Sequence, residues 1–110
     1  IIGNIEGKNC IILDDMIDTA GTICNAANAI KDMGAKAVYA GATHGVLVGP
    51  AIERIEKSPI KELVVTNTIP IEPEKRIDKI KVVSIAPLFA EAIKRLNEAK
   101  PLGDLFEYDK

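Results

Sequence analysis

Four short apolar runs alternate along the chain with segments of helical periodicity, and this alternation constrains the fold more than any other feature. The runs have the length of strands and occupy residues 10–13, 37–42, 62–67 and 80–85. Strands that alternate with helices pair in parallel through right-handed crossovers. The sequence therefore predicts an α/β fold with an open, mainly parallel sheet and flanking helices.

Three segments between and after these runs carry helix signals. Apolar residues spaced i, i+3, i+4 and i+7 over 23–30 share one helical face, and Gly34 is expected to end that helix. A second helix is predicted to begin at Gly49–Pro50 and to end before Pro59. A third begins at Ala86–Pro87, and its apolar stripe comprises Leu88, Phe89, Ala92, Ile93 and Leu96.

The charge balance and the composition exclude several function classes. Fourteen basic and sixteen acidic side chains give a net charge of −2, which argues against a broad basic field for nucleic acid. Aromatic residues make up only 4% of the chain, so platforms that stack bases are not expected. Charges and glycines interrupt the longer apolar stretches, so no membrane span is predicted.

Cys10 and Cys24 are too few for a disulfide framework or a metal cluster. Both lie in apolar surroundings and are predicted to be buried free thiols. This cysteine usage indicates a reducing, cytoplasmic compartment.

A loop rich in Asp, Thr and Gly follows the first predicted strand. Open parallel sheets bind ligands beyond the carboxyl ends of their strands, so this loop is the first candidate site. Residues 18–22 lead into a helix whose first turn offers N–H groups and a positive dipole end, which favour phosphate. Gly21 lets a ligand approach the backbone, and Thr19 and Thr22 supply hydroxyl donors. The loop carries no lysine and is therefore not a P-loop.

Asp14 and Asp15 add what a simple phosphate cradle would not need. Two carboxylates could accept hydrogen bonds from sugar hydroxyls, or interact with a Mg²⁺ that the ligand also holds. Donors at one end and acidic acceptors at the other suit a sugar phosphate. The alternative is purely structural, with Asp14 and Asp15 ending a strand and Asp18 capping a helix.

The run Ile12–Thr22 closely resembles the phosphoribosyl-pyrophosphate loop of proteins with the type I phosphoribosyltransferase fold. Its form Asp-Asp-Met-Ile-Asp-Thr-Ala-Gly-Thr is similar to that of the ribose-phosphate pyrophosphokinases, also called phosphoribosyl-pyrophosphate synthetases. Residues 42–51, 65–70 and 85–95 also resemble that family. The resemblance covers nearly the whole chain.

The resemblance implies a transferase of nucleotide biosynthesis. With Mg²⁺, such kinases move the diphosphoryl group of ATP to the 1-hydroxyl of ribose 5-phosphate, giving phosphoribosyl pyrophosphate and AMP. Positions 18–22 match those that hold the 5-phosphate in the family, and positions 14 and 15 match those that hold the ribose 2- and 3-hydroxyls. The substrate-binding residues implied in this way are Asp14, Asp15, Asp18, Thr19, Ala20, Gly21 and Thr22.

The same resemblance predicts that residues 1–110 form the C-terminal phosphoribosyltransferase-like domain, truncated at its N-terminal side, with the N-terminal domain absent. The family's ATP-binding elements, catalytic loop and most Mg²⁺ ligands lie upstream, so we expect no catalytic or metal residue in this segment and no activity of the segment alone. Members are homo-oligomers, and many are hexamers. Pro101 and Gly103 stand where many members carry the serines of a regulatory phosphate site, so those hydroxyl donors are missing here.

Two other functions remain open. One is a purine or pyrimidine phosphoribosyltransferase, which consumes phosphoribosyl pyrophosphate, and residues 42–51 argue against it. The other is a non-catalytic, synthetase-associated regulatory subunit, and the intact loop argues against that. His44, the sole histidine, is expected to fix a loop through a hydrogen bond rather than to act as a catalyst.

Overall fold

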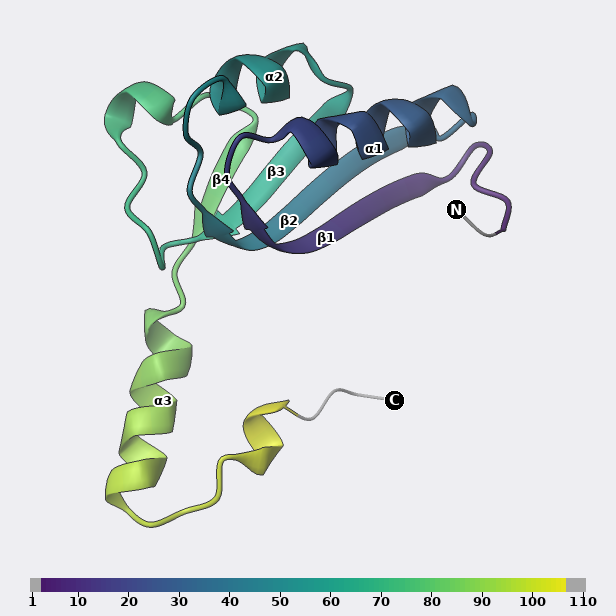
Figure 1. Ribbon diagram of the computed structural model, residues 1–110. Coiled ribbons are helices and arrows are strands. Elements are labelled where there is room, and N and C mark those ends of the chain that lie inside the picture. The colour runs from purple at the N-terminus through teal and green to yellow at the C-terminus, as the bar shows by residue number, and fades with distance from the viewer. Residues whose placement is uncertain (1–2, 107–110) are drawn as a thin grey trace.

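The computed structural model describes residues 3–106 of the chain. These residues form a four-stranded sheet and three α-helices. The apolar pair Ile1–Ile2 before Gly3, which as a sequence fits the tail of an earlier strand or a short edge element, lies outside the described residues. In chain order the elements are β1 (Asn9–Ile17), α1 (Gly21–Asp32), β2 (Ala37–Gly45), α2 (Ala51–Lys57), β3 (Ile60–Thr66), the 3₁₀ turn η1 (Pro73–Lys75), β4 (Ile80–Val83), α3 (Ala86–Asn97) and the 3₁₀ turn η2 (Gly103–Phe106). In Figure 1 the helices α1 and α2 lie on the sheet, and α3 extends away from it.

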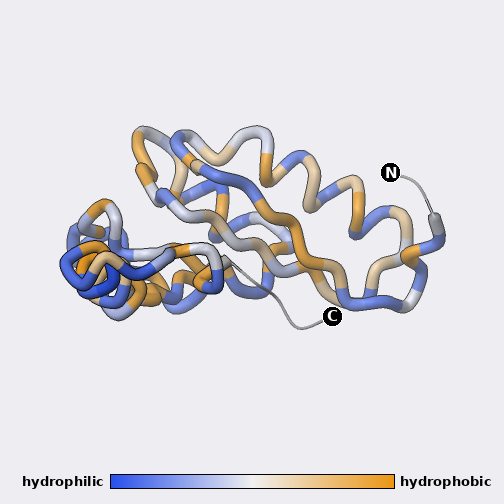
Figure 2. The backbone as a smooth tube through the Cα atoms, turned by 90° about the horizontal axis from the view of Figure 1, so that it is seen from below, coloured by the Kyte–Doolittle hydropathy of each residue, from blue (hydrophilic) through white to orange (hydrophobic). Residues whose placement is uncertain are grey.

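The sheet is entirely parallel, and its strands lie side by side in the order of the sequence, β1-β2-β3-β4. Helix α1 connects β1 to β2, and α2 connects β2 to β3, as the alternating pattern predicted. The α/β class with an open parallel sheet is thus confirmed. Hydrophobic stretches of chain run along the strands, and hydrophilic turns separate them (Figure 2).

The core lies between one face of the sheet and the helices α1 and α2. Its largest fully buried side chains come from α2, from β2 and β3 and from the loop that precedes α2: Leu47, Ile55, Ile60, Leu63, Val38 and Val65. Helix α1 contributes Ile23, Cys24 and Ala27. Ile23 and Ala27 belong to the face predicted from the sequence, and Cys24 lies beside it. Burial raises the pKa of the Cys24 thiol, whereas Cys10 is only partly buried, and both cysteines are free.

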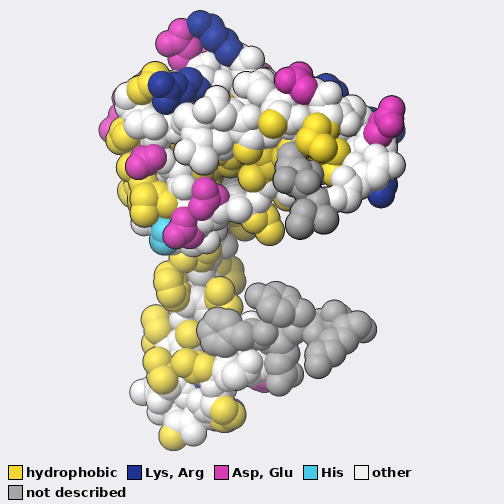
Figure 3. Space-filling view, turned by 45° about the vertical axis from the view of Figure 1, so that its right-hand side comes forward, with side chains coloured by type: hydrophobic (Ala, Val, Ile, Leu, Met, Phe, Trp, Pro, Cys, Tyr) yellow, Lys and Arg dark blue, Asp and Glu magenta, His cyan; other side chains and the backbone are white. Residues whose placement is uncertain are grey.

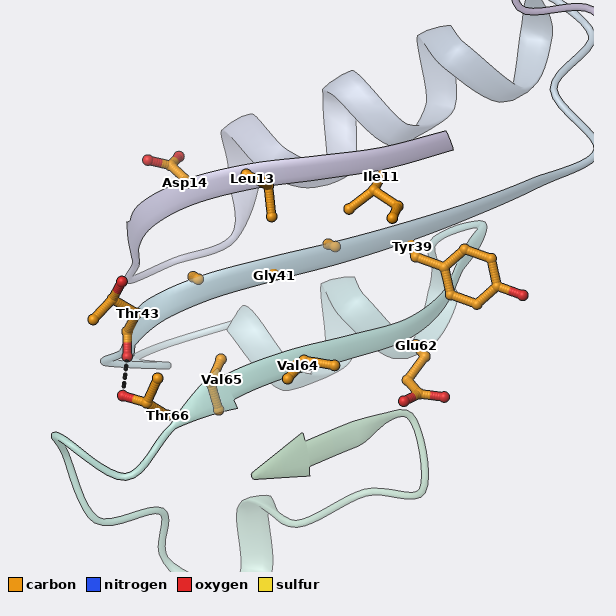
Figure 4. A pocket seen from close by; sticks show the side chains of 12 residues that line it. Ile11, Leu13, Asp14, Tyr39, Gly41, Thr43, Glu62, Val64, Val65 and Thr66 are labelled. Carbon is orange, nitrogen blue, oxygen red and sulfur yellow. Dashed lines mark hydrogen bonds between the residues drawn. The ribbon is translucent and has the colours of Figure 1, made fainter. Parts of the chain in front are cut away.

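The opposite face of the sheet is left uncovered by the described residues. Ile11 and Leu13 of β1 are 69% and 79% exposed. Their continuous apolar run is typical of a parallel strand that is buried on both faces. Leu13 leans over Gly41 of β2, where a methyl group would lie 3.2 Å from its Cδ2 atom. Figure 4 shows these side chains lining a shallow groove of about 580 Å³, with Val64 on its far side. The flanking helices therefore cover one face of the sheet only.

Helix α3 extends from the sheet through the junction that follows β4. The Asn67 side chain donates to Ser84 Oγ (3.2 Å) and accepts from the Ile85 amide (2.9 Å), so one amide group ties the start of α3 to the end of β3. Arg95 then joins α3 to η2 through an ion pair with Asp104.

The predicted apolar stripe of α3 is present, but it is exposed. Leu88, Phe89, Ile93 and Leu96 are 49–66% exposed, and no residue of this helix is buried within the described part of the chain. Figure 3 shows hydrophobic side chains gathered along this segment. Amphipathic periodicity predicted the helix, and it carried no information about what packs against the stripe.

The carboxyl ends of three predicted strands were wrong by two residues or more. β2 continues past Ala42 to Gly45. β1 continues past Leu13 to Ile17 and includes both aspartates, because pairing with β2 persists at Asp14↔Ala42, Met16↔His44 and Ile17↔Gly45. β4 ends at Val83, two residues earlier than predicted, because the chain turns there toward α3. No helix within residues 3–106 is long and apolar enough to cross a lipid bilayer.

The one-sided core predicts a strong difference between two leucines in strands. Leu63→Ala removes a side chain that is 0% exposed and should lower the free energy of unfolding by about 3 kcal/mol. Leu13→Ala removes the same atoms from a side chain that is 79% exposed and should cost under about 0.5 kcal/mol. Urea denaturation of the two variants measures this, and equal losses would contradict a core confined to the helix-covered face.

Candidate functional site

The candidate site is the connection from β1 to α1 at the carboxyl edge of the sheet. Asp18, Thr19 and Ala20 make this connection, and Ala20 is the N-cap of α1 in a left-handed conformation with φ 66°. No side chain caps the helix, so the helix cap predicted as the alternative role of Asp18 is not formed. The first-turn N–H groups of α1 therefore have no side-chain partner and are available to a ligand.

Most of the predicted site residues meet around one small cup of about 130 Å³. Its lining includes the acidic residues Asp14 and Asp18. The Asp14 carboxylate is directed away from the side chains of Leu13 and Ile11 (Figure 4). Asp15 does not line the cup, so the structure separates the two neighbouring carboxylates. The predicted residues that do line it are Asp14, Asp18, Thr19, Ala20, Gly21 and Thr22.

The aspartates also shape the backbone around the cup. Asp14 Oδ1 accepts a hydrogen bond from the Asp15 amide (2.8 Å), and Asp18 Oδ1 accepts one from the Thr19 amide (2.8 Å). The side chains of Asp14, Asp15 and Asp18 are all exposed. Asp18 therefore stabilises the loop that precedes α1 and adds negative charge beside the helix N-terminus.

A second segment holds this loop from behind. The Ile17 carbonyl accepts from the amides of Val46 (2.9 Å) and Leu47 (3.1 Å), and the Asp18 carbonyl accepts from the Val48 amide (2.9 Å). The next carbonyl, that of Thr19, accepts from Arg54 Nη1 of α2 at 3.1 Å. Three successive carbonyls of the loop are thus bonded to the segment between β2 and the middle of α2.

The sequence did not reveal this support. Backbone amides carry no sequence signal, and Arg54 reads as an ordinary charged residue on a short helix. The only hint is its place in the helix that was predicted to begin at Gly49–Pro50.

His44 and nearby threonines form a polar network at the next strand ends. His44 Nδ1 and Thr68 Oγ1 share a hydrogen bond of 2.8 Å, and the hydroxyls of Thr66 and Thr68 donate to the Thr43 carbonyl at 2.6 and 3.2 Å. The predicted loop-fixing hydrogen bond of His44 is confirmed. This network stabilises the ends of β2 and β3 beside the cup.

Within residues 3–106 no group of three or more His, Cys, Asp or Glu side chains is placed to hold a metal ion. Asp14 and Asp15 are sequence neighbours, but only Asp14 faces the cup.

Comparison with known protein families settles the family. The model of the phosphoribosyl synthetase-associated domain matches residues 1–107. The chain belongs to this family. Its match includes the whole candidate site and the strands on which the site is built.

Curated relatives agree with the family. The chain is 64% identical over 107 residues to a ribose-phosphate pyrophosphokinase of Clostridium acetobutylicum, covering 97% of this chain and 34% of the relative. It is 61% identical over 106 residues to one of Caldanaerobacter subterraneus subsp. tengcongensis, covering 96% of the chain and 34% of the relative. The chain thus spans about one third of the length of these relatives, and the matches do not support the narrower expectation of a C-terminal portion.

A solved structure shares the fold. The crystal structure of phosphoribosylpyrophosphate synthetase from Mycobacterium smegmatis superposes with a TM-score of 0.85 and 48% sequence identity. The superposition covers 89% of this chain and 33% of that one. The sheet and its helices therefore resemble about one third of the chain of that synthetase.

The support behind the cup predicts a backbone effect at Gly49, which has φ +58° and open space around its Cα. Gly49→Ala should lower the free energy of unfolding by about 1 kcal/mol, because an L-residue is strained in the left-handed region. Gly103→Ala is the matched control, since that glycine also faces open space but has no positive φ, and it should change stability by under about 0.5 kcal/mol. Equal effects in thermal denaturation would contradict a backbone origin.

Proposed function

We propose that this chain is the ribose 5-phosphate-binding part of a ribose-phosphate pyrophosphokinase. The complete enzyme transfers the diphosphoryl group of ATP to the 1-hydroxyl of ribose 5-phosphate, giving phosphoribosyl pyrophosphate and AMP. The observation that carries the proposal is the cup at the uncapped N-terminus of α1, which Asp14 at the end of β1 also lines. The 64% identity to a relative of that name supports it.

The helix end of the cup suits the 5-phosphate. Backbone N–H groups at Ala20, Gly21 and Thr22 lie at the positive end of the α1 dipole, where anions are stabilised. The hydroxyls of Thr19 and Thr22 would add donors to phosphate oxygens. Asp18 would act by holding the Thr19 amide and thereby the shape of the loop, because its own charge repels a phosphate.

The strand end of the cup suits the sugar. An ionised carboxylate only accepts hydrogen bonds, so Asp14 would bind ribose hydroxyls and disfavour a second phosphate at that end. Asp15 lies outside the cup and would reach a ribose hydroxyl only from its rim. The charge pattern orients the ligand, with phosphate toward α1 and ribose toward β1.

The rest of the reaction needs groups beyond these residues. In our proposal residues 1–110 belong to one phosphoribosyltransferase-like domain, and the remaining chain covers the open face of the sheet. ATP, the Mg²⁺ ligands and the catalytic residues would be held there, and the complete protein would be a homo-oligomer. This segment binds and orients one substrate, which is the part of catalysis that lowers the entropic cost of reaction.

Binding of ribose 5-phosphate tests the site. We expect Asp18→Ala and Thr22→Ala each to weaken it about tenfold, the loss expected for one hydrogen bond at a charged ligand. Asp32→Ala, at the far end of α1, is the matched control and should leave affinity unchanged. Calorimetry would be run on this chain and on the Clostridium acetobutylicum relative carrying it in place of the matching third. Unchanged affinity in both site variants would refute the assignment.

Activity separates the proposal from its alternatives. The chain alone should form no AMP from ATP and ribose 5-phosphate, whereas the relative carrying it should form AMP in a coupled assay. AMP formation by the chain alone would contradict its role as a substrate-binding part. Release of pyrophosphate from phosphoribosyl pyrophosphate and a nucleobase would instead identify a phosphoribosyltransferase. Failure of the carrier to form AMP while it still binds ribose 5-phosphate would favour a regulatory subunit.

A further inference from the structure

The guanidinium of Arg54 lies against the first residue of α1. Its Nη1 atom donates to the Thr19 carbonyl at 3.1 Å, and a methyl group on Gly21 would lie 3.2 Å from the same atom. Because residue 21 is a glycine, no side chain there competes for the space that the Arg54 guanidinium occupies. The guanidinium sits on the wall of a groove of about 320 Å³ between α1 and α2, behind the cup.

Peptide planarity gives this contact a consequence for the cup. In a trans peptide the C=O of Thr19 and the N–H of Ala20 point in opposite directions. Because Arg54 holds the carbonyl on the α2 side, the Ala20 N–H is directed away from α2. The residue that follows this peptide has φ 66°, a conformation that an alanine adopts only when its surroundings enforce it.

The Thr19–Ala20 peptide differs from the two before it. The carbonyls of Ile17 and Asp18 are held by the backbone amides of residues 46–48, which no substitution of a side chain removes directly. The Thr19 carbonyl depends on one side chain that comes from a different element. The orientation of the last amide before the helix is therefore controlled by residue 54.

We propose that Arg54 is a positioning residue for the phosphate end of the cup. It acts through the Thr19–Ala20 peptide, which it holds so that the Ala20 amide joins those of Gly21 and Thr22 in facing the ligand. The proposal rests on the proposed function, and it extends the site to a residue of α2. Lys57 lies one turn further along α2 and is paired with Glu53 at 2.6 Å, so it does not share this role.

The test compares three variants in the full-length relative that carries this chain. Arg54→Met keeps the length of the side chain and removes its donors, so the Kd for ribose 5-phosphate should rise about tenfold. Arg54→Lys keeps one donor and should recover part of the affinity. Lys57→Met removes a cation from the same helix and should change the Kd by less than about twofold, the scale of an exposed ion pair.

Steady-state kinetics distinguish positioning from a general loss of structure. In Arg54→Met the KM for ribose 5-phosphate should rise while the KM for ATP and kcat stay near those of the parent, because the altered peptide touches only one substrate. In ¹⁵N NMR spectra of the isotopically labelled chain, the Ala20 amide should shift on addition of ribose 5-phosphate in the parent and lose most of that shift in Arg54→Met.

The outcomes separate this inference from the function on which it rests. If the parent does not bind ribose 5-phosphate, the proposed function fails. If the parent binds and Arg54→Met binds equally well, only the role of Arg54 is overturned. If Arg54→Met does not fold, Arg54→Lys decides, because a weakened Kd with unchanged KM for ATP supports the inference and an unchanged Kd refutes it.

Discussion

Backbone hydrogen bonding between the end of β1 and the segment after β2 is the constraint on which the site depends. Parallel pairing carries the two strands together as far as Ile17 and Gly45, and the amides of residues 46–48 then continue the ladder onto the carbonyls of Ile17 and Asp18. A loop that would otherwise be free to move is thereby held on one side along its length. Its opposite side lines the cup with the backbone already oriented, so a molecule bound there would cost the chain little conformational entropy.

The packing of the sheet supports this arrangement from one face. Leu47 is 1% exposed and lies between two residues whose amides bond the loop, so the core anchors the same segment that holds the cup. The other face and the stripe of α3 expose apolar side chains on a scale that a soluble surface seldom carries. Both features agree with a chain that matches one third of its relatives' length.

The sequence was informative where a local rule decides the structure. Apolar periodicity and the Gly and Pro residues that interrupt it located the four strands and three α-helices of the described residues, but not the two 3₁₀ turns. The run from Asp14 to Thr22 lies at the carboxyl edge of the sheet, where a site was predicted. Strand ends were missed because aspartates favour turns, and only pairing with a neighbouring strand kept Asp14 extended. Arg54 was missed for a related reason, since its partner is a carbonyl 35 residues away. The exposure of the α3 stripe was not predicted, because the spacing of apolar residues carries no information about what packs against them.

The junction at Asn67 determines how α3 can meet whatever packs on it. One side-chain amide bonds both Ser84 and the Ile85 backbone, while the helix itself has no buried residue in the described part of the chain. The orientation of α3 relative to the sheet is therefore set by hydrogen bonds at its first residues, and among residues 3–106 no buried contact further along the helix supports it. A small rotation of α3 about its first residues would move Leu96 much further than Leu88. The geometry of any interface made by the stripe therefore depends on Asn67, which follows β3, and not on residues of the cup at the end of β1.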